Sequence, residues 1–192
     1  ICDIHQPREN INLKDVFFIQ RQLPDFIEWS DAHLLDGAKF AIGESYKGQV
    51  AWDASVLNHG LIAGATGSGK TSIIRCIIHQ AIQKKWNISV LDFKGSGDYT
   101  DLEKAYGPMV VSEPEEARQL LLALITEVKY RAVKFKEYSV SNIEEYNALG
   151  KERFIPWLLV IDEAAEILDV KPTDKTQKEL YTEISQSLRT LA

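Results

Sequence analysis

One segment constrains this sequence more than any other, because it functions only inside a particular fold. Gly64 to Thr71 reads GATGSGKT and fits the pattern G-x-x-x-x-G-K-[ST] at every fixed position. By accident, a chain of this length matches those positions with a probability of about 0.01 at average residue usage. The pattern requires a strand before it and a helix after it, and the sequence predicts both, over residues 57–63 and 71–85. A binding site for nucleotide phosphates is therefore expected here.

Each residue type in this loop has a physical role in holding phosphate. The glycines let the backbone wrap tightly and turn its N–H groups inward, and the following helix directs its positive end to the same point. Lys70 supplies a charge to the β- and γ-phosphates, and the Thr71 hydroxyl can ligate Mg²⁺. The predicted nucleotide-binding residues in this segment are Gly64, Ala65, Thr66, Gly67, Ser68, Gly69, Lys70, Thr71 and Ser72.

A second candidate feature is a pair of carboxylates that follows an apolar strand. Residues 158–161 read LLVI and run directly into Asp162 and Glu163. Asp162 suits the outer coordination sphere of Mg²⁺, and Glu163 suits a general base that takes the proton of an attacking water. A helix N-terminus also favours acidic residues, but the phosphate loop earlier in the chain favours the catalytic interpretation.

Asp92 closes another predicted strand, over residues 88–93. Ligands collect at the carboxyl ends of parallel strands, so Asp92 is a further candidate for nucleotide binding. A solvated turn is the alternative interpretation.

Short apolar runs alternate with long amphipathic ones through most of the chain. Besides those above, strands are predicted at 109–111 and 157–161, and a helix from Pro114 to about Lys136 with Ser112 as its N-cap. The run at 157–161 is typical of a strand at the centre of a parallel sheet. The alternation predicts an α/β domain over residues 57–192. Residues 1–56 are predicted to form a small N-terminal α/β extension, with a hairpin between 38 and 52.

Composition narrows the function classes. A content of 45% hydrophobic residues excludes wholesale disorder, and a net charge of −6 excludes a basic nucleic-acid footprint over the whole surface. The longest apolar run, 120–125, is far shorter than the roughly 20 residues that span a bilayer. Two cysteines form no disulfide framework and fit a reducing compartment. The chain begins at Ile1 and ends within a helical pattern, so we expect an excised fragment.

Five segments together resemble the motor domain of the FtsK/SpoIIIE family of hexameric translocases. Each is similar to a family motif in the same order along the chain. They are HGLIAGATGSGK at 59–70, LDFKG at 91–95, EVKYR at 127–131, NIEEYN at 142–147 and VIDEAAEIL at 160–168.

The resemblance implies a RecA-like P-loop NTPase fold with a mostly parallel sheet flanked by helices. It implies hydrolysis of ATP with Mg²⁺ by a hexameric ring that moves double-stranded DNA in chromosome segregation or conjugative transfer. It also implies that Arg131 acts in trans as an arginine finger, making Lys70, Glu163 and Arg131 the expected catalytic residues. From the residues alone, however, Lys129, Arg131, Lys134 and Lys136 form a solvated helix face.

Family members continue beyond the equivalent of this chain's last residues, so the sheet is expected to lack its last strands and the ATPase core to be incomplete at its C-terminus. A cytoplasmic domain of a membrane-anchored bacterial protein is implied, with the anchor in segments outside this chain.

Two alternatives remain open. Type VII secretion ATPases resemble the same motifs and move polypeptide instead of DNA. The net charge of −6 argues weakly against tight DNA binding, although a ring needs only a basic pore lining. The other alternative is an assembly module that binds nucleotide without turnover. The intact Lys70, Thr71, Asp162 and Glu163 argue against it.

Overall fold

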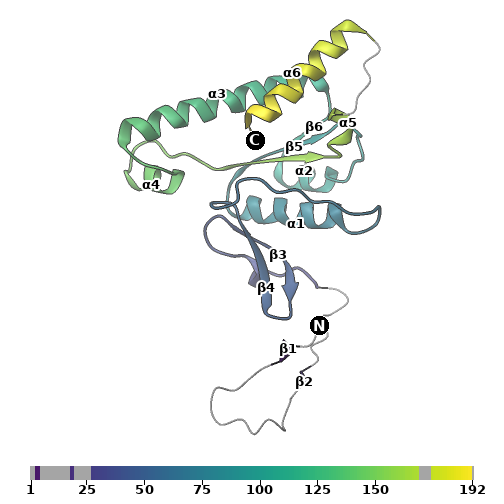
Figure 1. Cartoon of the computed structure of the whole chain (residues 1–192), viewed down its shortest axis with the longest axis vertical. Coiled ribbons are helices and arrows are strands. Elements are labelled where there is room, and N and C mark those ends of the chain that lie inside the picture. The colour runs from purple at the N-terminus through teal and green to yellow at the C-terminus, as the bar shows by residue number, and fades with distance from the viewer. Residues whose placement is uncertain (1–2, 5–17, 20–26, 169–173, 192) are drawn as a thin grey trace. The chain divides into compact units, whose positions relative to one another are not determined.

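The computed structural model describes residues 3–4, 18–19, 27–168 and 174–191. The chain divides into two compact units, Ile1–Asn58 and His59–Ala192 (Figure 1). Much of the predicted N-terminal extension, namely residues 1–2, 5–17 and 20–26, lies outside the described residues. In the described part of the chain, no helix has both the length and the apolar character needed to cross a bilayer.

The first unit is built on antiparallel pairs of strands. β1 (Asp3–Ile4) pairs with β2 (Phe18–Ile19), and η1 (Asp31–His33) is a short 3-10 helix. β3 (Lys39–Ser45) and β4 (Gly48–Asp53) form a hairpin, which confirms the prediction for this segment. Phe40 and Trp52 face each other across it with their rings stacked 5.3 Å apart, a cross-strand pair that fixes the register.

The second unit contains a three-stranded parallel sheet, as predicted. Its strands are β5 (Asn87–Asp92), β6 (Val110–Val111) and β7 (Trp157–Asp162), in the order β6-β5-β7. β5 and β7 are in register along their whole length, so their last residues, Asp92 and Asp162, are paired neighbours.

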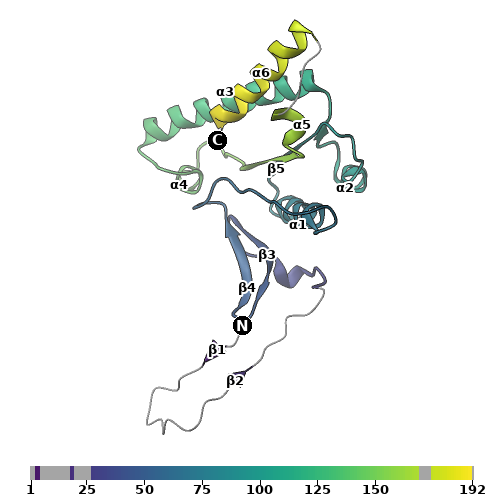
Figure 2. The ribbon, with the colours of Figure 1, turned by 45° about the vertical axis from the view of Figure 1, so that its right-hand side comes forward.

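Helices cover both faces of this sheet (Figure 2). α1 (Lys70–Gln83) packs against β5 and β7 on one side, and α3 (Pro114–Tyr138) packs with α6 (Lys175–Leu191) on the other. Three short helices complete the unit: α2 (Thr100–Tyr106), α4 (Ile143–Ala148) and α5 (Ala165–Leu168). The helices predicted at 71–85 and 114–136 are therefore confirmed.

The core lies where α3 and α6 meet the sheet. Helical spacing places the buried residues of α3 on one face, which is why this helix could be predicted from its sequence. Pro114 occupies its first turn, and Glu113 takes the N-cap position that was predicted for Ser112. The buried residues of this core cluster are Leu91, Ala117, Leu121, Leu124 and Ile184.

Two strand predictions are wrong, and both errors concern pairing. Residues 57–63 form no strand, and Leu61 is 91% exposed. β7 was expected at the centre of the sheet, but β5 is the central strand. Among the described residues, no strand pairs with the outer edge of β7. An apolar segment becomes a strand only when its backbone N–H and C=O groups find a neighbouring strand, and residues 57–63 have none in this structure.

Candidate active site

The phosphate loop has the backbone that its sequence predicts. Gly67 and Gly69 have φ angles of 76° and 92°, a left-handed region that strains other residues, and Ser68 N donates to Ala65 O at 3.1 Å. A Cβ added at Gly64 would lie 2.5 Å from Ser68 Oγ, so the turn also needs glycine for close approach. Residues 64–69 are exposed, which leaves the loop accessible to a ligand.

Lys70 begins α1 and folds back over the loop. Its Nζ donates to Gly64 O at 2.7 Å and to Ala65 O at 3.1 Å. An ammonium has three donors, so one remains for a phosphate that approaches the loop. Thr71 and Ser72 follow in the first turn of the helix, where the helix dipole is positive.

The topology brings this loop to the carboxyl edge of the sheet. α1 is 14 residues long, about 21 Å, and β5 has 6 residues, about 20 Å. Only residues 84–86 connect them, so α1 runs back along the sheet and its first residue is level with the end of β5. Both views show the loop before α1 on the same side of the domain as the ends of β5 and β7 (Figures 1 and 2).

Two carboxylates, Asp162 and Glu163, lie at the carboxyl end of β7. Asp162 is half-buried and is the last residue of the strand, and its Oδ2 accepts a hydrogen bond from the Tyr99 hydroxyl at 2.7 Å. Glu163 is exposed and has a φ of 53°, in the left-handed region. Strained backbone of this kind clusters at functional sites, which supports the catalytic interpretation of Glu163.

Asp92, at the same edge of the sheet, has a structural role. It is only 3% exposed, and its carboxylate accepts four hydrogen bonds from the turn that follows β5. The donors are Lys94 N and Gly95 N to Oδ1, and Ser96 N and Ser96 Oγ to Oδ2, at 3.0–3.1 Å. Asp92 therefore shapes this turn, and a contact of its own with nucleotide stays a prediction.

Tyr99 contacts the candidate site residue Asp162, and the sequence did not predict this contact. It is 1% exposed and lies 63 positions before its partner Asp162. Burial raises the pKa of Tyr99, and the hydrogen bond to Asp162 raises it further, so the hydroxyl stays protonated and remains a donor. No motif or periodicity marks this tyrosine, because its role depends on the pairing of β5 with β7.

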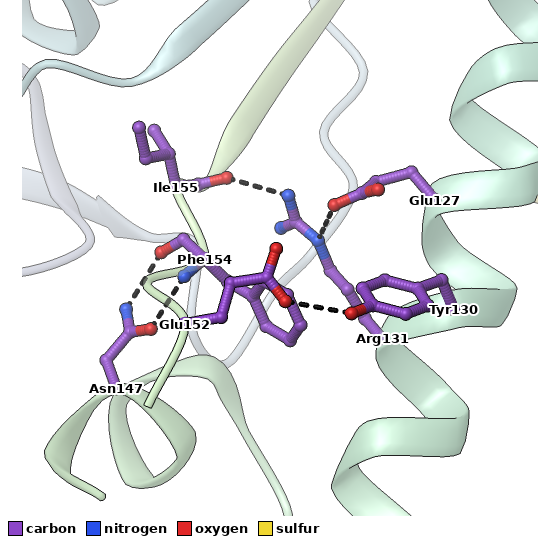
Figure 3. Close-up of polar contacts among 7 residues, drawn as sticks. All are labelled: Glu127, Tyr130, Arg131, Asn147, Glu152, Phe154 and Ile155. Atoms are coloured by element: carbon purple, nitrogen blue, oxygen red, sulfur yellow. Dashed lines mark hydrogen bonds and ion pairs between the residues drawn. The ribbon is translucent and has the colours of Figure 1, made fainter. Parts of the chain in front are cut away.

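Arg131 is held at the other end of β7, by residues of α3 and of the segment that leads into this strand (Figure 3). Its Nε donates to Glu127 Oε1 at 2.7 Å, its Nη2 donates to Ile155 O at 3.0 Å, and its guanidinium is 5.0 Å from the centre of the Phe154 ring. Its side chain is 17% exposed, so the predicted solvated position is wrong for this residue. Ile155 precedes β7, whose length of about 20 Å separates Arg131 from Asp162.

The segment at 142–147, which resembles a family motif, packs against Phe154 as Arg131 does, and these residues together form the Arg131 cluster. Asn142 caps α4 by accepting from Glu145 N at 2.8 Å, and Tyr146 stacks on Phe154 at 4.4 Å. Asn147 bonds both the N–H and the carbonyl of Phe154 at 2.8 Å (Figure 3). This segment therefore fixes the residues that lead into β7.

Comparison with known proteins places these features in a family. The FtsK/SpoIIIE family profile matches residues 28–157, which is more than half of the chain. The chain belongs to the FtsK/SpoIIIE family. The predicted family is thereby confirmed, with four of the five segments inside the matched range and the segment at 160–168 beyond it, and the P-loop α/β fold is confirmed as well.

The FtsK/SpoIIIE relatives of this chain include proteins named for DNA translocation and proteins named for secretion. DNA translocase FtsK of Clostridium tetani is 37% identical over 147 residues, covering 70% of this chain and 20% of the relative. Type VII secretion system protein EssC of Staphylococcus aureus strain NCTC 8325 is 34% identical over 126 residues, covering 59% of this chain and 8% of the relative. This chain thus spans a fifth or less of these relatives.

A solved structure of a conjugation coupling protein matches nearly the whole of this FtsK/SpoIIIE-family chain. The pCW3 conjugation coupling protein TcpA, in a monomer form with ATPgS, superposes with a TM-score of 0.84 at 28% identity. The match covers 98% of this chain and 54% of TcpA.

Proposed function

We propose that this chain is the ATP-hydrolysing part of a motor that moves double-stranded DNA, in chromosome segregation or conjugative transfer. The observation that carries the proposal is that the loop of Lys70 lies on the same side of the domain as the carboxyl end of β7, where Asp162 and Glu163 are found. The names of two relatives, a DNA translocase and a conjugation coupling protein solved with an ATP analogue, support DNA as the cargo.

The residues at this edge divide the chemistry among them. Residues 64–72 hold the phosphates of ATP, with the remaining donor of Lys70 on the β- and γ-phosphates. The Thr71 hydroxyl and the Asp162 carboxylate are hard oxygen donors of the kind that Mg²⁺ prefers, so they fit this ion. When bound, Mg²⁺ neutralises charge on the phosphates. Glu163 is exposed to water and accepts the proton of the attacking water molecule.

DNA as cargo predicts a particular dependence on salt. A motor that grips the phosphate backbone releases counterions on binding, so its affinity falls steeply with ionic strength. We expect duplex DNA to stimulate ATP hydrolysis by the assembled protein, and the stimulation to be largely lost between about 50 and 200 mM salt. Steady-state ATPase assays with duplex DNA, and with single-stranded DNA of the same sequence as the control, measure this effect. An unchanged rate with duplex DNA at low salt would contradict DNA as the cargo.

Ring assembly gives Arg131 two separable roles. Within the chain, Arg131 joins α3 to the residues that lead into β7. To act as an arginine finger in the site of a neighbouring subunit, its guanidinium must break the hydrogen bonds to Glu127 and to Ile155 O. Arg131→Ala is expected to lower the free energy of unfolding by about 1–3 kcal/mol, because the Glu127 carboxylate and the Ile155 carbonyl lose their charged donor. Urea denaturation measures this, with Lys129→Ala on the exposed side of α3 as the control. Equal stability of the two variants would contradict the joining role.

The role of Arg131 in trans is tested in hexameric rings of mixed subunits. Adding Arg131→Ala subunits to wild-type protein is expected to lower ATPase activity more than in proportion to their share. A proportional decrease would remove the finger from the proposal.

Polypeptide transport is the second candidate, favoured by the relatives named EssC. A polypeptide motor would ignore DNA in the assay above and respond to its protein substrate. For either cargo, we place this chain as a cytoplasmic domain of a membrane-anchored bacterial protein, with the anchor in other segments.

A further inference from the structure

The Tyr99 hydroxyl joins two parts of the active-site edge that are distant in sequence. It donates to Asp162 Oδ2 at 2.7 Å, and its ring is 1% exposed. Tyr99 is the N-cap residue of α2, in the segment that follows β5, and Asp162 ends β7, so the bond joins that segment to the end of the strand beside β5. A part-buried hydrogen bond of this length restricts the orientation of both groups.

The segment that carries Tyr99 is held at both ends. Before it, Asp92 accepts four hydrogen bonds from residues 94–96. Around it, Arg75 of α1 donates to the carbonyl of Asp98 and to the carboxylate of Asp101. Since α1 also begins with the phosphate loop, Tyr99 is fixed to the same helix that positions Lys70. The hydroxyl therefore has a defined place relative to both the loop and the strand.

We propose that Tyr99 is a positioning residue that holds one oxygen of Asp162, Oδ2, so that the other, Oδ1, is presented to the coordination sphere of Mg²⁺. The inference rests on the proposed function, in which Asp162 helps to hold this ion. A carboxylate at a strand end can rotate about its side-chain bonds, and binding a metal restricts that rotation. A hydrogen bond that has already fixed the carboxylate lowers the entropic cost of metal binding.

The test compares two tyrosines that each donate to a carboxylate. Tyr99→Phe removes only a hydroxyl and keeps the buried ring. Tyr130→Phe removes the matching hydroxyl from a bond to Glu152 Oε2 at 2.8 Å, in the Arg131 cluster (Figure 3). Mn²⁺ serves as a paramagnetic probe in place of Mg²⁺, and electron paramagnetic resonance measures its dissociation constant in the presence of a slowly hydrolysed ATP analogue.

We expect Tyr99→Phe to weaken Mn²⁺ binding about tenfold or more, as the loss of outer-sphere partners does in other metal sites. The affinity for the analogue in EDTA should not change, because Tyr99 acts only through Asp162. Tyr130→Phe should leave both affinities unchanged. Wild-type affinity for Mn²⁺ in Tyr99→Phe would overturn the inference.

A double-mutant cycle separates positioning from a general loosening of the fold. In an Asp162→Asn background, adding Tyr99→Phe should not weaken Mn²⁺ binding further, because the partner of the hydroxyl is already altered. Fully additive losses would overturn the inference. Wild-type protein that binds the analogue but no Mn²⁺ would overturn the metal role of Asp162, and wild-type protein that binds neither would overturn the proposed function as a whole.

Discussion

Glu163→Gln is expected to lower the rate of ATP hydrolysis about 10²–10⁴-fold while leaving ATP affinity unchanged. The amide has nearly the shape of the carboxylate but cannot accept the proton of the attacking water. The exposed position of Glu163 at the end of β7 gives a water molecule access to this carboxylate. Calorimetry measures the binding, and release of inorganic phosphate by the assembled protein measures the turnover.

A nearby carboxylate provides the control for this variant. Glu166 is also exposed, but it lies within α5 rather than at the strand end. Glu166→Gln removes the same charge and should leave the rate within a small factor of wild type. Comparable losses in the two variants would mean that the local negative charge, rather than a general base at position 163, accounts for the effect.

Lys70→Ala is expected to weaken ATP binding about 10- to 100-fold, the effect of losing roughly 1.5–3 kcal/mol from a charged hydrogen bond. The loss should be greater for ATP than for ADP, because the ammonium faces the β- and γ-phosphates in the proposed complex. Calorimetry with both nucleotides measures this difference.

Lys70 also stabilises the phosphate loop itself, so the effect of lost charge must be separated from the effect of a loosened loop. Lys70 also bonds Gly64 O and Ala65 O, so its removal loosens the loop as well as removing the charge. Loosening alone would weaken ATP and ADP binding equally. Lys104→Ala, on the exposed side of α2, removes the same charge elsewhere and should change neither affinity. Unchanged ATP affinity in Lys70→Ala would contradict the site assignment.

The parts of the fold that were predictable are those fixed by local pattern. The apolar spacing of α3 depends only on residues within one helix, and so does that of α1. The strand at 57–63 failed because strand formation depends on a neighbour far away in the sequence. The predicted central position of β7 was wrong for the same reason, since its apolar run predicts burial but not which strand lies on each side.

The active site shows the same division. Lys70, Thr71, Asp162 and Glu163 could be predicted as site residues because a short motif or a strand end marks each of them. Tyr99 was missed because its partner is 63 residues away and only the folded sheet brings them together. Arg131 has the spacing of a solvated helix residue, but Phe154 and Ile155 cover its guanidinium from another segment.

The left-handed backbone at Glu163 has a consequence for how this chain evolves. A φ of 53° costs a residue with a side chain about 1–2 kcal/mol relative to glycine. A lineage under pressure for heat resistance alone would gain from glycine at this position and would lose the proposed general base in the same step. Stabilising substitutions are usually neutral or costly for function, and Glu163→Gly is expected to be costly, because greater stability and ATP turnover favour different residues at position 163.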